Sequence, residues 1–282
     1  MEIGIGLPGH APWTDGRQLV EFARRADARG FSALGVSDRL LWTSPEPLVA
    51  LAAAAGATAR IGLITSVLLA PLHTNHLLFA KAVLTLDQLA GPNRLRLGLA
   101  AGFRPDDFTA SGVDYATRGK QFTALLNLLD DACNDRVDIG LRPATPGGPP
   151  MLFGGTSKAA LRRIATRGTG WIAGTASVRD LEEFIPEINQ EWVNEGRAGT
   201  PRVVASVMYA LGPDAHGAVS RAISSYHEFG ASLGAAIASS IAAVSIAGTG
   251  TEGFTRGFTT GAIVAIVAAV AALAITPGSR RG

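Results

Sequence analysis

The chain of 282 residues contains a single cysteine, Cys133. One thiol excludes a disulfide framework and a multi-cysteine zinc site, and it suits a reducing compartment. An excess of charge of one sign is also lacking, because 25 basic and 23 acidic residues leave a net charge of +2, which gives no reason to expect a nucleic-acid partner. The opening residues, MEIGIGLPGH, include no basic segment followed by a long apolar stretch. We therefore expect no secretory signal and a cytoplasmic protein.

Three common site signatures are absent as well. No GxGxxG follows the first apolar run, where residues 10–13 read HAPW, so a Rossmann fold is poorly supported. Ser66 and Ser157 do not stand in a GxSxG context, which argues against a hydrolase nucleophile. His73 and His76 have no third ligand at a recognisable spacing, so we expect no metal site.

Short apolar runs alternate with amphipathic segments up to about residue 230. Strands are predicted over Ile3–Leu7, Ala33–Ser37, Ile61–Leu68, Leu95–Ala100, Pro150–Phe153, Gly170–Ile172 and Arg202–Ala210. The first four begin at residues 3, 33, 61 and 95, so they are 30, 28 and 34 residues apart, which is about the length of a βα unit. This rhythm predicts an α/β fold of the (β/α)8 TIM-barrel type.

Helical periodicity fills the intervals between these strands. Leu78, Ala82, Leu86 and Leu89 form one apolar stripe that ends at Gly91. The longer interval before the fifth strand carries residues 137–149, which are rich in proline and glycine and predict an irregular connection.

Charge becomes scarce after Gly230. Residues 230–282 contain only four charged groups, Glu252, Arg256, Arg280 and Arg281. We therefore divide the chain into a barrel over residues 1–229 and an apolar, helical tail over 230–282, with the eighth βα unit missing or replaced by the tail. Residues 258–275 are 18 consecutive uncharged residues, just long enough to cross a bilayer. The tail either contacts a membrane through this run or folds back over the barrel.

Polar residues follow several predicted strands, and the loops after barrel strands are where such folds bind their ligands. The candidates are Asp38 after the second strand, Thr65, Ser66 and His73 after the third, Gly102 and Arg104 after the fourth, and Gly154–Ser157 after the fifth. His73 fits a proton-handling or cofactor-contacting role, and it fits a surface loop equally well. Asp38 either orients a ring or a base, or caps the next segment. Arg104 offers a fixed charge to a phosphate or carboxylate, or is simply solvated.

The turn after the fifth strand runs directly into a helix. Gly154 and Gly155 let the backbone approach a ligand closely, and Thr156 or Ser157 can cap the helix. Free amides at a helix N-terminus favour an anion such as phosphate, although ordinary turn chemistry explains the same residues.

Two acidic residues, Asp106 and Asp107, are adjacent, so their side chains are expected to diverge and to make a poor acid–base pair.

Six segments in this order and spacing carry a family resemblance. They are MEIGIGLPG, LVEFARRADARGFSALGVSD, ARIGLITSVLLAPLHTN, LDQLAGPNRLRLGLAAGFRPDDFTASGVDYATRG, PGGPPMLFGGTSKAALRRIATRGTGWIAG and RVVASVMYALG. Through them residues 1–230 resemble the luciferase-like monooxygenase family of flavin-dependent oxidoreductases. The tail resembles the end of a drug-efflux transporter of the major facilitator type.

The resemblance implies a (β/α) barrel that binds FMN or, as an alternative, the deazaflavin coenzyme F420. Gly154, Gly155, Thr156 and Ser157 would hold the cofactor phosphate, with help from Arg104 after Gly102. Thr65 and Ser66 would lie under the isoalloxazine ring, with a cis peptide at the Ser66–Val67 link. Asp38 and His73 would face the ring, and His73 is the first choice for proton transfer.

One departure leaves the cofactor open, because members that use the deazaflavin often carry Asp-His after the second strand, and this chain has Asp38–Arg39. The implied activity is oxidation or reduction of a small organic substrate, with NAD(P)H or a separate flavin reductase supplying electrons. A homo-oligomer is a further expectation. Two other functions remain open, a non-catalytic flavin-binding degenerate barrel and a membrane-tethered fusion product.

Overall fold

A parallel β-sheet organises the computed structural model, which describes residues 2–7, 16–174 and 177–206. Its strands follow the order β1-β2-β3-β5-β6-β7-β8, with β4 also paired to β5. Their bounds are β1 Gly4–Gly6, β2 Ala33–Val36, β3 Gly62–Thr65, β4 Leu68–Leu69, β5 Leu95–Ala100, β6 Met151–Phe153, β7 Gly170–Ala173 and β8 Arg202–Ala205. Every pairing is parallel. The predicted strands are therefore confirmed in number and order, with differences at Ser66–Val67 and at Ser206, which are not in strands, and residues 207–210 lie outside the described residues.

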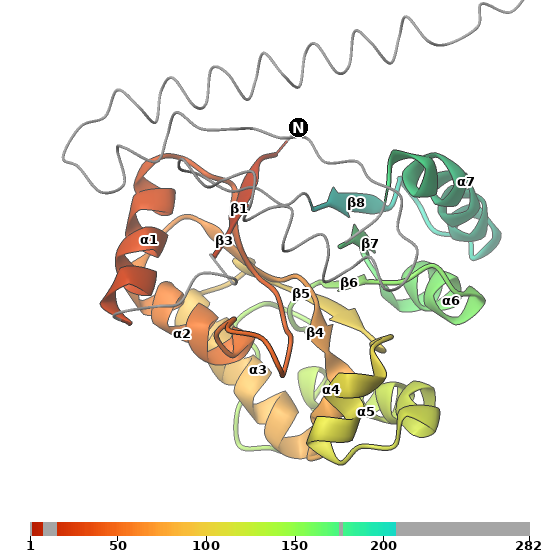
Figure 1. The fold of residues 1–282 in the computed structure, drawn as a ribbon, viewed down its shortest axis with the longest axis horizontal. Helices are drawn as coiled ribbons and strands as arrows, with labels where there is room; N and C mark the ends of the chain where they lie inside the picture. Colours follow the sequence, from red (N-terminus) through yellow and green to blue (C-terminus); the bar gives the residue numbers. More distant parts are fainter. Residues whose placement is uncertain (1, 8–15, 175–176, 207–282) are drawn as a thin grey trace, which may run out of the picture. The chain divides into compact units, whose positions relative to one another are not determined.

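Helices follow the strands in turn and surround the sheet (Figure 1). Their bounds are α1 Arg17–Ala28, α2 Pro47–Ala57, α3 His76–Ala90, α4 Pro105–Ser111, α5 Arg118–Cys133, α6 Lys158–Arg167 and α7 Val178–Asn194, with 3-10 turns η1 Ala70–Leu72 and η2 Tyr115–Thr117. Because each helix returns the chain to the start of the next strand, all the strands run in one direction. The carboxyl-terminal ends of the strands therefore lie at one edge.

The third barrel strand is interrupted by a bulge between β3 and β4. Ile64 pairs with Arg96 and Leu68 pairs with Leu99, so three residues on this strand face two on β5. The Ser66–Val67 peptide bond within the bulge is cis, as the resemblance implies. β3 and β4 thus occupy a single barrel position, and the described strands fill seven positions.

The sheet is curled, so its two edge strands approach each other. The Arg202 side chain, at the start of β8, forms an ion pair with Glu2, next to β1. This is the α/β, TIM-barrel-like architecture that the strand rhythm predicts. The predicted absence of an eighth βα unit and the boundary at residue 229 lie outside the described residues, as does the tail over 230–282.

The helix α3 differs from its predicted orientation. Its buried face consists of Phe79, Ala80, Val83, Leu84, Leu86, Asp87 and Ala90. Leu78 and Leu89, two members of the predicted stripe, are 65% and 53% exposed. The stripe was wrong because α3 is apolar on more than one face, so a 3.6-residue period fits several faces and cannot choose between them.

The irregular segment before β6 is confirmed, since residues 137–149 contain no helix or strand. It is attached to α3 by a buried contact. The Asp87 carboxylate accepts hydrogen bonds from the Thr145 amide and hydroxyl, each at 2.8 Å. Because α5 returns the chain to the start of β6, this segment lies at the amino-terminal end of the strands.

Among the described residues, no helix has the length and apolar character needed to span a bilayer.

The bulge depends on a glycine in β5. Thr65 Oγ1 donates to the Gly98 carbonyl at 2.8 Å and accepts from its amide at 2.9 Å. A Cβ on Gly98 would overlap the Thr65 carbonyl oxygen. We therefore expect Gly98→Ala to lower the free energy of unfolding by about 3 kcal/mol in urea titrations.

A matched glycine lies in the exposed part of α2. A Cβ on Gly56 would meet nothing within 4 Å. Gly56→Ala should raise the free energy of unfolding by about 0.5–1 kcal/mol, because alanine favours helix. Equal effects of the two substitutions would contradict this account of the bulge.

Candidate active site

The carboxyl-terminal ends of β2, β4 and β6 bring the predicted residues to one edge of the sheet. Asp38, just after β2, accepts a hydrogen bond from the Leu69 amide of β4 at 2.8 Å. A Cβ on Gly154, just after β6, would lie 3.5 Å from a Val67 methyl group. Asp38, the cis peptide and the glycine turn therefore lie along a continuous line of strand ends.

The turn between β6 and α6 keeps a fixed shape. The Gly154 amide donates to the Leu99 carbonyl at 2.9 Å, which ties the turn to β5. Gly155 has φ +93°, a conformation that favours glycine. The Ser157 side chain accepts from the Ala160 amide at 3.2 Å and caps α6, as one of the two predicted caps. Gly155, Thr156 and Ser157 are exposed, as are Lys158 and Ala159 at the start of α6.

A tryptophan supports this turn from the next strand. Trp171 in β7 is 1% exposed, and its indole Nε1 donates to the Gly155 carbonyl at 3.1 Å. Its ring packs edge-on against Phe184 of α7, with centroids 4.9 Å apart. Sequence reasoning missed this residue, because an apolar residue in a buried strand gives no signal of a polar contact.

Two predicted ligand-binding residues have structural partners. Thr65 is fully buried, and its hydroxyl is used by Gly98 within the sheet. Gly102 lies against the Phe108 ring, which a Cβ would approach to 2.9 Å. Both positions thus help to build the strand ends, and their contact with a cofactor stays a prediction. Ser66 stands in the bulge, where its amide donates to the Val36 carbonyl at 2.7 Å.

Burial gives Asp38 and His73 opposite protonation tendencies. Burial raises the pKa of Asp38 from 3.8 to about 6, assisted by the negative charges of Glu46 and Asp107 and opposed by the Leu69 amide and Arg39. Burial lowers the pKa of His73, whose ring lies 4.7 Å from that of Phe79. His73 is therefore neutral near pH 7, whereas Asp38 titrates closer to neutrality than an ordinary aspartate.

The raised pKa of Asp38 gives a pH-dependent stability. A carboxyl whose folded pKa exceeds its unfolded value stabilises the fold at low pH, and this contribution is lost as the pH rises from about 4 to about 6. We expect Asp38→Asn, which keeps an acceptor for the Leu69 amide, to exceed the wild type in unfolding free energy by roughly 2–3 kcal/mol near pH 8 and to match it near pH 4. Urea titrations at both pH values test this. A constant difference would contradict it.

Arg39 forms contacts that sequence reasoning missed. Its Nε donates to Asp107 Oδ2 at 2.8 Å, and its Nη2 lies 3.5 Å from Asp106 Oδ2. The Arg39 and Asp107 side chains are 9% and 1% exposed. The expectation that Asp106 and Asp107 diverge is therefore incomplete, because both adjacent carboxylates meet one guanidinium supplied by the loop after β2.

Two further side chains complete this cluster. The Arg39 Cζ lies 4.2 Å from the centroid of the Trp42 ring, and Arg104 Cζ lies 6.0 Å from it. Arg104 also contacts Asp106, with Nη2 3.4 Å from Oδ2. These contacts place Arg104 beside α4 and Trp42, and its predicted help to a phosphate at the glycine turn stays a prediction.

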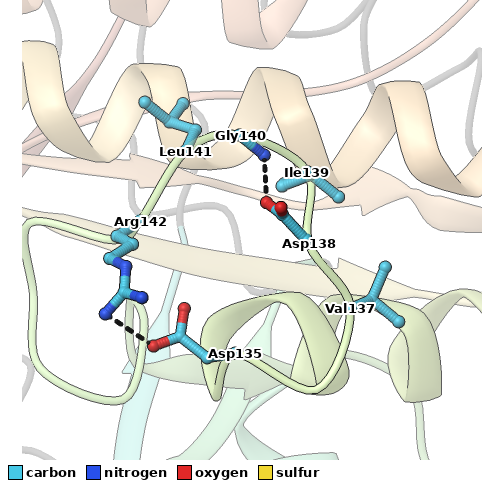
Figure 2. A pocket seen from close by; sticks show the side chains of 7 residues that line it. All are labelled: Asp135, Val137, Asp138, Ile139, Gly140, Leu141 and Arg142. Carbon is cyan, nitrogen blue, oxygen red and sulfur yellow. Dashed lines mark hydrogen bonds and ion pairs between the residues drawn. The ribbon is translucent and has the colours of Figure 1, made fainter.

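Two other features were considered as functional sites, namely a metal-binding cluster and the cavity in the loop before β6. No group of three or more potential metal ligands occurs among the described residues. A cavity of about 530 Å³ is lined by residues of a single loop, 135–142, in which Asp135 pairs with Arg142 at 2.8 Å (Figure 2). This loop lies at the amino-terminal end of the strands and contains none of the predicted site residues, so we assign it no chemistry.

Known proteins resemble the chain in both sequence and fold. An uncharacterized protein of Mycobacterium tuberculosis is 31% identical over 174 residues, which cover 57% of this chain and 60% of that protein. The F420-dependent glucose-6-phosphate dehydrogenase of Kribbella flavida is 32% identical over 214 residues, or 67% of this chain and 63% of the enzyme. The chain thus spans less than two thirds of the length of these relatives.

A solved structure shares the fold. The oxygenating constituent of 3,6-diketocamphane monooxygenase from Pseudomonas putida, in complex with FMN, is 20% identical, with a TM-score of 0.62 over 74% of this chain and 67% of that one. A family model described as luciferase-like monooxygenase matches residues 1–261, which extends the resemblance beyond residue 230. The described strands, the bulge and the glycine turn thus belong to a chain that is a member of the luciferase-like monooxygenase family.

Proposed function

We propose that this protein is a flavin- or deazaflavin-dependent oxidoreductase that acts on a small organic substrate. The observation that carries the proposal is the turn at Gly154–Ser157, which presents backbone amides at the N-terminus of the ten-residue helix α6. FMN and coenzyme F420 both carry a phosphate group, and this turn suits that group. Family membership and the cofactors named for its relatives support the same conclusion.

The residues fit such a cofactor in charge and in space. Gly155, Thr156 and Ser157 are exposed, and the charged residue that follows them in the chain is a cation, Lys158. Trp171 and the cap at Ser157 hold the turn before any ligand arrives, so little conformational entropy is lost on binding. The bound group would supply hydride transfer or oxygen activation, and the chain would orient it and exclude water.

Asp38 is the proton carrier that we propose for this reaction. Its carboxyl lies at the end of β2, where the Leu69 amide fixes one oxygen, and its pKa of about 6 allows both protonation states near neutral pH. His73, the first choice from the sequence, is held neutral by burial and would contact the ring or the substrate. NAD(P)H or a separate reductase would return electrons to the cofactor.

An absorption and fluorescence spectrum of the purified protein, before and after mild reduction, tests the proposal. Bound FMN gives a yellow protein that bleaches on reduction, whereas the deazaflavin gives a strongly fluorescent one with a distinct spectrum. The same protein should consume NAD(P)H or a test substrate when cofactor is added. A protein that binds neither cofactor when mixed with them would refute the proposal, and binding without turnover would indicate a non-catalytic barrel.

A further inference from the structure

The cluster around Arg39 contains a buried donor that has no partner. Among the described residues, Arg39 Nη1 is buried and donates no hydrogen bond within the protein, and the Arg39 side chain as a whole is only 9% exposed. A buried guanidinium edge without an acceptor costs free energy, so such an atom calls for a ligand oxygen or a water. The second oxygen of its partner, Asp107 Oδ1, is also buried and unpaired.

An internal carboxylate already occupies the space between the two arginines, and it does so loosely. Asp106 Oδ2 lies 3.5 Å from Arg39 and 3.4 Å from Arg104, beyond the usual length of a charge-assisted hydrogen bond. The Asp106 side chain is 42% exposed, in contrast to Asp107. Asp106 can therefore turn into solvent, whereas Asp107 cannot leave Arg39.

Trp42 fixes the direction of the arginine. The indole ring lies 4.2 Å from the Arg39 guanidinium carbon, and Asp107 holds Nε on one edge. With the face covered and one edge bound, the remaining donors keep a set orientation, which is what planar recognition of a carboxylate or phosphate requires.

We infer that Arg39, Trp42 and Arg104 form an oxyanion-binding subsite for a carboxylate or phosphate group, and that Asp106 occupies it when no ligand is bound. The inference rests on the proposed function and deepens it, because the subsite stands beside Asp38 at the same strand ends. The anion belongs either to the substrate or to an acidic group of the cofactor, and it is distinct from the phosphate at the Gly154–Ser157 turn.

Titration with inorganic phosphate, followed by the NMR signal of the Arg39 Nε–H group, tests the subsite directly. The signal is assigned by its loss in Arg39→Gln. We expect it to shift on titration in the full chain. In Asp106→Asn, which removes the competing charge, the apparent Kd should fall by about tenfold. Asp131→Asn removes a carboxylate of similar exposure, 39% against 42% for Asp106, that pairs with Arg136, and it should leave the Kd unchanged.

The outcomes separate the subsite from the proposed function. Amide signals of Gly155 and Thr156 report phosphate at the turn, so binding there can fail or succeed independently of Arg39. An Arg39 signal that phosphate does not move, or an equal Kd in wild type and Asp106→Asn, would overturn the subsite. Repeating the titration on cofactor-loaded protein identifies the source, since a cofactor group that fills the subsite blocks phosphate and a substrate group leaves it open.

Discussion

Gly155→Asp is expected to abolish cofactor retention. The new carboxylate would stand among the first amides of α6, where we place the cofactor phosphate. Two like charges about 4 Å apart repel by roughly 4 kcal/mol at the effective dielectric of a protein surface, which corresponds to about a thousandfold loss of affinity. Fluorescence titration of the cofactor-free protein with FMN and with the deazaflavin measures the change.

Two variants separate charge from backbone strain in this experiment. Gly155→Ala imposes the same φ of +93° on a side chain without charge, and its Cβ would meet Ala160 Cβ at an ordinary 3.6 Å. We expect Gly155→Ala to keep most of the affinity, although it costs about 1–2 kcal/mol of stability. Thr156→Val removes one hydroxyl and should reduce the affinity only a fewfold. Tight binding by Gly155→Asp would exclude this turn as the phosphate site.

The second large effect is expected from Asp107→Asn. This substitution keeps the shape of the side chain but leaves the Arg39 charge in a site that is only 9% exposed, with the loosely held Asp106 as its remaining counter-charge. Removing one member of a buried ion pair typically costs about 3–5 kcal/mol, and we expect a loss near the lower limit. Thermal or urea unfolding monitored by circular dichroism measures it.

The paired replacement Arg39→Met with Asp107→Leu is the informative control. Because both charges leave together, no uncompensated charge remains, and stability should return to within about 1 kcal/mol of the wild type. The double variant should nevertheless lose the oxyanion subsite while retaining the cofactor at the Gly154–Ser157 turn. Asp107→Asn with unchanged stability would show that Arg39 is solvated in solution.

The strand rhythm and the glycine turn were predictable because their causes are local. Parallel strands buried on both faces require consecutive apolar residues, and the helix between two strands sets their spacing at about 30 residues. The cap at Ser157 and the positive φ of Gly155 are likewise written in a few adjacent residues. These features depend on short-range geometry, so the packing of the rest of the molecule does not change them.

The orientation of α3 and the partners of Arg39 were not predictable from those patterns. Apolar residues on more than one face of α3 weaken the contrast that marks a buried face, so only packing decides that Leu78 and Leu89 remain exposed. Arg39 and Asp107 are 68 residues apart in the chain. Each appeared as an ordinary loop or helix-end charge, since no spacing rule links residues at that separation.

By itself, the sequence determined a parallel α/β fold of this family and a glycine turn with a capped helix after β6, since short-range sterics and hydrogen bonding specify both. Only the tertiary structure decided the charge state of the site. It buried Asp38 beside Leu69, kept His73 neutral and joined Arg39 to Asp107 over the strand ends. The physical reason is that burial and long-range charge depend on which strand ends become neighbours, and the curl of the sheet sets those neighbours.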